Sequence, residues 1–223
     1  NQAIRILCNV VNEQAGMAAE RAFLPAPEFC DLMREKGLPL FSLESCAPLI
    51  EFDVVGITLP HELAATNVLE TLDLAGIPLR SADRGESDPL VFAGGPCAFN
   101  PEPYAPFFDA FSIGEGEESV PEMLALHRSL KERGASRTEM RRELAKLPGC
   151  YVPSLYDWAG EAEAQDAGSW IRPKHEDLPT EFTKRLFDGF ADSSAWEPCI
   201  VPFTEAVHDR LNVEILRGCT RGC

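Results

Sequence analysis

The 223-residue chain has few basic residues and no long apolar run. Lys and Arg number 20 against 36 Asp and Glu, which gives a formal net charge of -16. This charge disfavours non-specific binding to nucleic acid or to an anionic membrane, because both need basic patches. No stretch approaches the roughly 20 apolar residues of a membrane span, and no basic-then-apolar leader opens the sequence. We therefore expect a cytoplasmic protein with no membrane partner and no direct nucleic-acid binding by this part.

Several common catalytic motifs are also missing. The sequence has no Gly-x-Ser-x-Gly elbow, no phosphate loop ending in Gly-Lys-Ser/Thr and no His-Glu-x-x-His. A disulfide framework is not expected either, because a chain of this length can build its core without one. The eight cysteines are scattered except for Cys219 and Cys223. We interpret the other six mostly as small, partly buried thiols.

Strands alternate with helices through the first 135 residues. The pattern predicts short strands at 21–24, 52–59, 89–93 and 110–113, and helices at 4–11, 28–36, 62–75 and 119–134. Such alternation is typical of βαβ units around a parallel sheet. We expect residues 1–135 to form one doubly wound, Rossmann-like domain whose first strand lies upstream of Asn1.

The segment at 52–59 is the strongest strand signal. Its nearly continuous apolar character predicts burial on both faces of a parallel sheet. The helix that follows should turn Leu63, Val68, Leu72 and Ala75 toward that sheet.

The remaining residues give a weaker signal. Residues 136–210 are expected to connect two domains, with a helix at 137–146, a strand at 149–155 and a linker or β-ribbon from 171 to 197. Residues 211–216 alternate apolar and polar side chains like a strand and lead into the last cysteine pair. We therefore place the start of a second domain at 211–223.

The candidate ligand site lies just after three predicted strands, since open α/β sheets bind ligands beyond the carboxyl ends of their strands. His61 and Glu62 follow the first of these strands. They are interpreted either as a cap and dipole partner at a helix start or as a catalytic pair. The second strand ends in Gly94, Gly95 and Pro96, which allow close approach of a planar or phosphate-bearing ligand, or simply form a tight turn.

The third strand ends in Gly114, Glu115, Gly116 and Glu117. Its spacing resembles a dinucleotide fingerprint, but carboxylates beside a helix N-terminus would repel a pyrophosphate and balance the helix dipole themselves. A flexible acidic loop is better suited to hydroxyl, amide or cationic groups.

Cys219 and Cys223 lie on a loop after the last predicted strand. Two thiolates at this spacing can bind one metal centre, although two ligands do not complete a usual site. A small-loop disulfide or two unconnected cysteines are the alternatives at this point.

Three motifs in this order resemble the N-terminal part of B12-binding-domain-containing radical S-adenosylmethionine (SAM) proteins. They are Gly-Gly-Pro at 94–96, Gly-Glu-Gly-Glu at 114–117 and Arg-Gly-Cys-Thr-Arg-Gly-Cys at 217–223. The segments at 72–80, 86–91 and 203–210 are similar to an uncharacterised subfamily of that group. The resemblance spans nearly the whole chain.

The resemblance implies a [4Fe-4S] cluster bound by Cys219, Cys223 and a third cysteine just past residue 223. It also implies SAM cleavage to a 5′-deoxyadenosyl radical, an electron donor such as flavodoxin or ferredoxin, and a (β/α) barrel whose first strand is 211–216. The expected reaction is radical methyl transfer or rearrangement on an unidentified substrate.

For the N-terminal domain the resemblance implies a cobalamin site, with the corrin across the strand ends and its nucleotide tail near the Gly-Gly-Pro and Gly-Glu-Gly-Glu loops. The alternative is a domain of the same shape that binds no cobalamin. The Asp-x-His-x-x-Gly motif that supplies a lower axial histidine does not occur in this sequence. Two other functions stay open: a non-catalytic module that binds a ligand or partner, and an RNA-modifying enzyme that resembles the methylthiotransferases.

Overall fold

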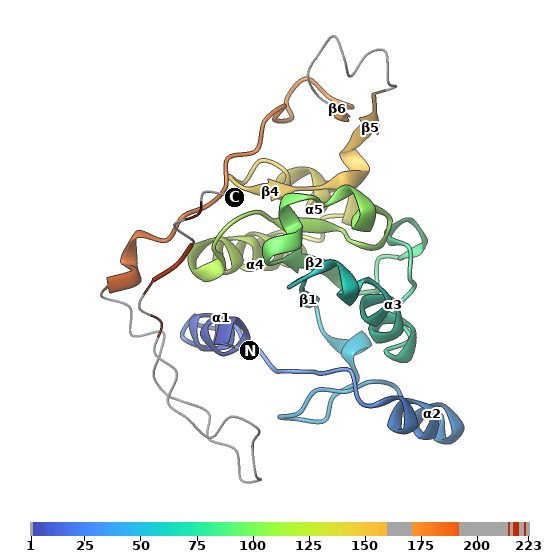
Figure 1. Ribbon diagram of the computed structural model, residues 1–223. Helices are drawn as coiled ribbons and strands as arrows, with labels where there is room; N and C mark the ends of the chain where they lie inside the picture. The colour runs from blue at the N-terminus through green and yellow to red at the C-terminus, as the bar shows by residue number, and fades with distance from the viewer. Residues whose placement is uncertain (1, 160–170, 192–213, 215, 219–220, 222–223) are drawn as a thin grey trace.

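A mixed four-stranded sheet forms the centre of the protein (Figure 1). The computed structural model describes residues 2–159, 171–191, 214, 216–218 and 221. The strands, in the order in which they lie side by side, are β1 (Val54–Thr58), β2 (Leu90–Gly94), β3 (Ala110–Ser112) and β4 (Cys150–Tyr151). The β1–β2 and β2–β3 pairs are parallel, and β4 is antiparallel to β3. This α/β architecture with a parallel core agrees with the predicted class.

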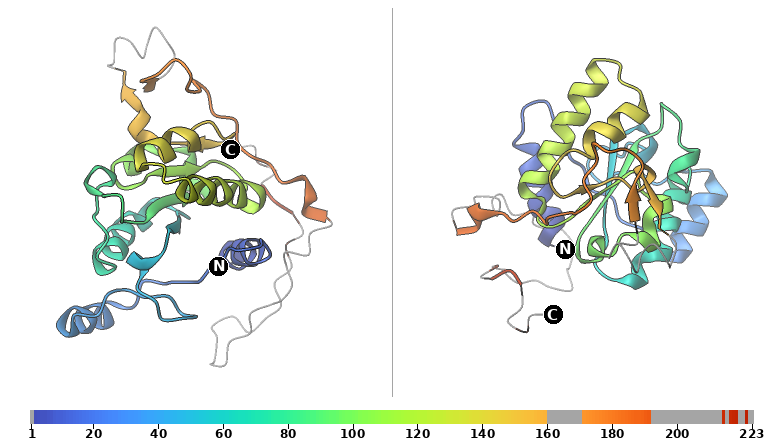
Figure 2. Two further views of the ribbon diagram at one scale, coloured as in Figure 1. Left: turned by 180° about the vertical axis from the view of Figure 1, so that it is seen from behind. Right: turned by 90° about the horizontal axis from the view of Figure 1, so that it is seen from above.

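Helices cover both faces of the sheet, so the domain has three layers (Figures 1 and 2). On one side lies α4 (Gly116–Glu132), which contacts both α1 (Gln2–Asn12) and α5 (Arg137–Leu144). On the other side lies α3 (Ala65–Leu74), and α2 (Pro27–Lys36) lies farther out near it. The strand order follows the chain without reversal, so the described strands contain no switch point.

Short 3-10 helices complete the connections; they are η1 (Leu49–Glu51), η2 (Glu62–Ala64), η3 (Ser81–Asp83), η4 (Pro96–Phe99), η5 (Glu102–Phe107), η6 (Pro153–Leu155) and η7 (Asp188–Ala191). Among the described residues, no helix has the length and apolar character to cross a bilayer.

The helix ends follow local chemistry. Gly37 closes α2 in the left-handed conformation that glycine favours at a helix C-terminus. A capping box starts α5, with Ser136 accepting from the Glu139 backbone N–H while the Glu139 carboxylate accepts from the Ser136 N–H. The helix α4 begins at Gly116, three residues before its predicted start. Glu117 and Glu118 therefore lie in its first turn, where a negative charge is favourable.

The outer position of β1 in the described sheet contradicts its predicted burial on both faces. Val55 is its only buried residue, and Gly56 is exposed. The prediction for the following helix is right for Val68, Leu72 and Ala75 but wrong for Leu63, which is 84% exposed. Leu63 lies in η2, before the regular turns that give the later residues their common face.

The predicted strand at 21–24 is also wrong. These residues have no ladder partner in the described part of the chain, although the Leu43 N–H donates to the Arg21 carbonyl oxygen at 2.8 Å. A single hydrogen bond of this kind holds the chain without making it a strand.

The predicted connecting region contributes directly to the sheet through β4. A two-stranded ribbon follows, with β5 (Tyr156–Trp158) antiparallel to β6 (Ile171–Pro173). Its second strand lies at the start of the segment 171–197 predicted as linker or ribbon, whereas its first strand lies before that segment. From β6 the chain returns alongside the sheet (Figure 1, orange). The boundary at residue 135 stays a prediction.

A buried carboxylate binds three arginines at the end of the sheet opposite the candidate site. Asp109 directly precedes β3, and its side chain is 0% exposed. One of its oxygens accepts from Arg84 and Arg137, both at 2.9 Å, and from the Val91 N–H at 2.8 Å. The other accepts from Arg141 at 2.6 Å and 3.0 Å.

Backbone carbonyl oxygens take up the remaining donors of Arg84, at Pro78, Leu79 and Phe107. Burial lowers the pKa of Arg84, and the negative charge of Asp109 opposes that effect. The carboxylate therefore joins the β2–β3 crossover to the start of α5.

Candidate functional site

The three loops named from the sequence meet at one edge of the sheet. Because β1, β2 and β3 are parallel, their carboxyl ends point the same way. The β1 exit carries His61 and Glu62, the β2 exit carries the Gly-Gly-Pro turn, and the β3 exit carries the Gly-Glu-Gly-Glu loop. The first two loops form a pocket, whereas the third is covered by later parts of the same chain.

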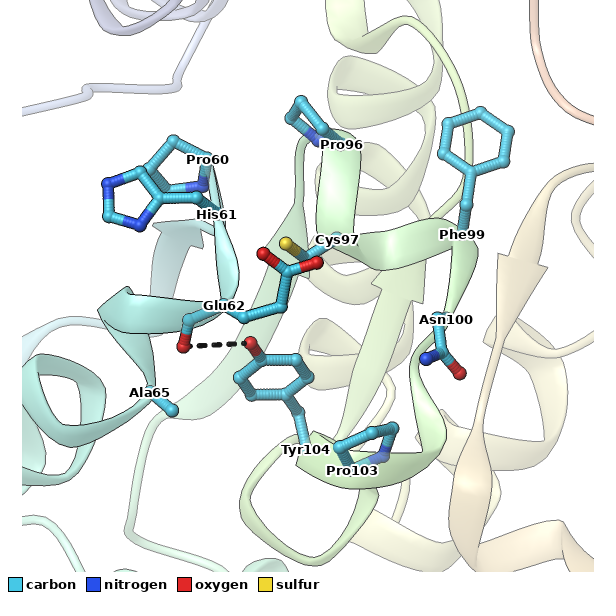
Figure 3. A pocket seen from close by; sticks show the side chains of 10 residues that line it. All are labelled: Pro60, His61, Glu62, Ala65, Pro96, Cys97, Phe99, Asn100, Pro103 and Tyr104. Atoms are coloured by element: carbon cyan, nitrogen blue, oxygen red, sulfur yellow. Dashed lines mark hydrogen bonds between the residues drawn. The ribbon is translucent and has the colours of Figure 1, made fainter. Parts of the chain in front are cut away.

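An open pocket of about 470 Å³ lies between the β1 and β2 exits (Figure 3). Its lining residues are Pro60, His61, Glu62, Ala65, Pro96, Cys97, Phe99, Asn100, Pro103 and Tyr104. The Glu62 carboxylate and the Cys97 thiol face each other above the Tyr104 ring, while His61 lies beside Pro60 and points away from them.

Tyr104 forms the floor of this pocket. It is 5% exposed, and its hydroxyl lies 3.5 Å from the Glu62 carbonyl oxygen, which makes a weak hydrogen bond. Burial raises the pKa of Tyr104, and the neighbouring Cys97 and Glu62 add to the shift. The phenol therefore stays neutral at neutral pH and keeps the proton that it donates to the Glu62 carbonyl oxygen.

The Gly-Gly-Pro turn is attached to the β1 exit by two hydrogen bonds. The Leu59 N–H donates to the Gly94 carbonyl oxygen at 2.7 Å, and the Cys97 N–H donates to the Leu59 carbonyl oxygen at 3.1 Å. Gly95 has φ of +98°, and a Cβ there would lie 3.1 Å from both the Leu59 carbonyl oxygen and the Thr58 hydroxyl. Gly95 is thus required by the protein's own packing.

Gly114 is covered in the same way by the returning chain. It has φ of +109°, and a Cβ there would lie 2.3 Å from the Arg185 carbonyl oxygen. The Arg185 N–H donates to the Ile113 carbonyl oxygen at 2.9 Å, and the Glu115 N–H donates to that of Arg185 at 3.0 Å. The Phe187 N–H donates to the Glu115 carboxylate. Residues 183–187 therefore lie directly on the β3 exit.

The Arg185 side chain reinforces this contact. Its guanidinium makes two hydrogen bonds to Glu122, at 2.8 and 2.9 Å, and one to Glu118 at 3.2 Å. The bond to Glu122 is the main cause that raises the pKa of Arg185. Both carboxylates come from the start of α4, so the segment is fixed to helix and loop together.

The other acidic residues of the loop bind Arg217, from the cysteine motif. The Arg217 guanidinium lies 2.5 Å from a Glu117 carboxylate oxygen, 3.7 Å from Glu115 and 3.0 Å from Glu214. Burial acts to lower the pKa of Arg217, but hydrogen bonds to Glu117 and Glu214 outweigh it and raise the pKa. The loop binds a cation, as its charge predicts, and that cation is part of the chain.

Cys219 and Cys223 lie outside the described residues, as does most of the predicted barrel strand at 211–216. In the described part of the chain, no group of three His, Cys, Asp or Glu side chains could hold a metal ion. Of the other cysteines, Cys30 and Cys150 are buried, Cys8 and Cys97 are half-buried and Cys46 is exposed. All five are free thiols.

Sequence reasoning missed several contributors to this edge. Phe99, Asn100 and Tyr104 come from the connection between β2 and β3, which the sequence shows only as a proline-rich turn. The rule that crossover connections between parallel strands are right-handed could have indicated these residues, because it places such a connection close to the sheet. Arg185 and Arg217 are distant in sequence, and no local pattern links them to α4.

The protein is a three-layer α/β domain with a parallel core and a pocket beyond the carboxyl ends of its strands. Residues 3–153 match the family described as radical SAM proteins, N-terminal. The match covers more than half of the chain, and the protein belongs to this family. Membership implies an enzyme that in general uses an iron–sulfur cluster and SAM. No curated protein and no solved structure matches the chain significantly.

Proposed function

We propose that the protein is the N-terminal part of a radical SAM enzyme in which Cys219 and Cys223 bind a [4Fe-4S] cluster with a third cysteine past residue 223. The observation that carries the proposal is the family match over 3–153 followed, in the same chain, by a Cys-x3-Cys motif. Three thiolate ligands leave one iron open, as catalytic metal sites require. When bound, the cluster supplies the electron that cleaves SAM, received from a flavodoxin or ferredoxin.

The chemical character of the donors fits this group. Both residues are cysteines, the usual ligands of iron–sulfur clusters, and each is preceded in the sequence by a glycine, at 218 and 222. The reaction proposed is radical methyl transfer or rearrangement.

Replacing either cysteine with alanine should abolish the activity. We expect the C219A and C223A variants of the full-length protein to lose their cluster absorbance after reconstitution with iron and sulfide. Formation of 5′-deoxyadenosine from SAM under reduction should fall to background, because the cluster delivers the electron. C46A is the matched control, since Cys46 is an exposed free thiol of the described domain. Full cluster loading in C219A would refute the assignment of that ligand.

Cobalamin binding is not part of the proposal, because the strand-end loops do not form an open cradle. Protein atoms already fill the space beside Gly95 and Gly114, so a planar ring has no free approach there. Gly116 is also covered, by Leu7 of α1. We therefore derive no step through cobalamin.

A ligand-binding module without catalysis is the second candidate, and the 470 Å³ pocket favours it because its lining residues all fall within 3–153. Titrating the full-length protein with hydroxocobalamin tests whether cobalamin is a ligand of this pocket. From the covered glycines we expect no shift in the cobalamin spectrum. A saturable shift, reduced by replacing Glu62 with alanine but not by replacing the exposed Glu132, would instead place cobalamin at this pocket.

A further inference from the structure

The acidic loop after β3 contains a carboxylate that needs a partner. The Glu117 side chain is 7% exposed, and the Arg217 guanidinium lies 2.5 Å from it. The first turn of α4 contributes backbone N–H groups and a favourable dipole, but a buried carboxylate still loses most of its hydration. Removing one member of such a pair leaves the other charge uncompensated. Arg217 is therefore more than a surface contact of this loop.

The two arginines that reach this region bind different carboxylates. Arg217 binds Glu115 and Glu117, whereas Arg185 binds Glu118 and Glu122. Both arginines come from the last 40 residues of the chain and all four carboxylates come from residues 115–122. The start of α4 thus holds two separate cationic groups from later in the sequence.

We propose that Glu115 and Glu117 form an intramolecular docking site for Arg217, and that this contact positions the cysteine motif against the N-terminal domain. The role assigned to the cysteines rests on the proposed function. Arg217 precedes Cys219 by two residues, and two residues of chain reach at most about 7 Å. Fixing Arg217 to the start of α4 therefore restricts where the first cluster ligand can go.

This assignment explains the composition of the loop. The β3 exit has two glycines and two glutamates because Gly114 and Gly116 admit the Arg185 backbone and Leu7, while the glutamates bind Arg217. A loop built for an anionic cofactor would instead present N–H groups and positive charge. Arg217 and Glu117 are positioning residues in this proposal.

Limited trypsin digestion of the full-length protein tests the docking without reference to activity. Trypsin cleaves after Arg217 only when its side chain is free to enter the protease. We expect the E117Q variant to release the fragment ending at Arg217 about tenfold faster or more, the change that loss of a charge-assisted hydrogen bond produces. E118Q is the control, because Glu118 lies in the same helical turn but binds Arg185. Equal rates in E117Q, E118Q and wild type would overturn the proposal.

Charge reversal gives a second test, which is still informative if one of the variants folds poorly. Amide hydrogen exchange over residues 214–218 should become faster in E117R and in R217E, and slow again in the E117R/R217E double variant. Exchange in the double variant as fast as in the single variants would count against a direct pair.

EPR spectroscopy of the same variants tests whether the contact between Glu117 and Arg217 affects the cluster. E117Q should keep its iron but show an altered cluster EPR signal with SAM and a raised KM for SAM, while E118Q should match wild type. If E117Q speeds cleavage while C219A keeps its cluster, the docking stands and the cluster assignment fails. An unchanged EPR signal and KM in a loosened E117Q would refute positioning.

Discussion

Replacing Asp109 with asparagine is expected to lower the free energy of unfolding by about 3–5 kcal/mol. The carboxylate is fully buried and accepts hydrogen bonds from three arginines. Asparagine keeps the shape but removes the only carboxylate that Arg84 contacts among the described residues, and the Arg84 side chain is itself 0% exposed. The cost is therefore that of leaving buried positive charge without a partner, in addition to the lost hydrogen bonds.

Thermal unfolding followed by circular dichroism measures this effect. For a domain of this size, such a loss lowers Tm by roughly 6–20 °C. The matched control is D177N, because Asp177 also binds an arginine of α5, Arg142 at 3.1 Å, but on the surface. We expect D177N to melt close to wild type. A Tm of D109N equal to that of D177N would show that the buried contacts of Asp109 with the three arginines contribute little to stability.

Replacing Gly114 with alanine should have the second large effect, and it should act on a segment about 70 residues away in sequence. The added Cβ would lie 2.3 Å from the Arg185 carbonyl oxygen and 2.4 Å from its backbone nitrogen. Backbone atoms cannot rotate aside as a side chain can, so residues 183–187 must move. The positive φ adds a strain of about 1–3 kcal/mol.

Hydrogen exchange distinguishes these two contributions. In G114A the amide of Arg185, which donates to Ile113, should exchange at least about tenfold faster, because its hydrogen bond is broken. Gly134→Ala is the control, since Gly134 has φ of +71° and nothing within 4 Å of an added Cβ. The Gly134→Ala variant therefore has the backbone strain of a positive φ but no steric clash at the added Cβ. Unchanged protection of Arg185 in G114A would contradict the contact.

Much of the fold follows from local patterns. The helix signals at 28–36 and 137–146, with Gly37 and the Ser136 capping box at their ends, correspond to α2 and α5 because periodicity and capping are properties of neighbouring residues. Errors occur where tertiary position decides. Leu63 has the right spacing but precedes the regular helix, and the apolar segment of β1 lies at the edge of the described sheet.

The site was predicted only in part, for a related reason. Composition indicates that the Gly-Glu-Gly-Glu loop suits hydroxyl, amide or cationic groups of a ligand, and the sequence alone does not identify the chain's own Arg217 as its partner. The Gly-Gly-Pro glycines are open to two interpretations in the sequence, room for a ligand or a tight turn. In the structure, protein atoms fill the space beside Gly95 and also beside Gly114. A glycine pattern indicates that another group packs closely against the backbone. Only the three-dimensional structure shows whether that group is a ligand or another part of the protein. The Asp109 cluster gave no sequence signal, because its members are spread over 58 positions.

The contact between Gly114 and Arg185 also bears on where this protein can be divided. The family match ends at residue 153, yet the hydrogen bonds that complete the β3 exit come from 185 and 187. A chain that ends at residue 153 would keep all four strands of the main sheet but lose Arg185, which contacts both Gly114 and Glu118. We therefore expect a chain that ends at residue 153 to be less stable than one that keeps residues 183–187.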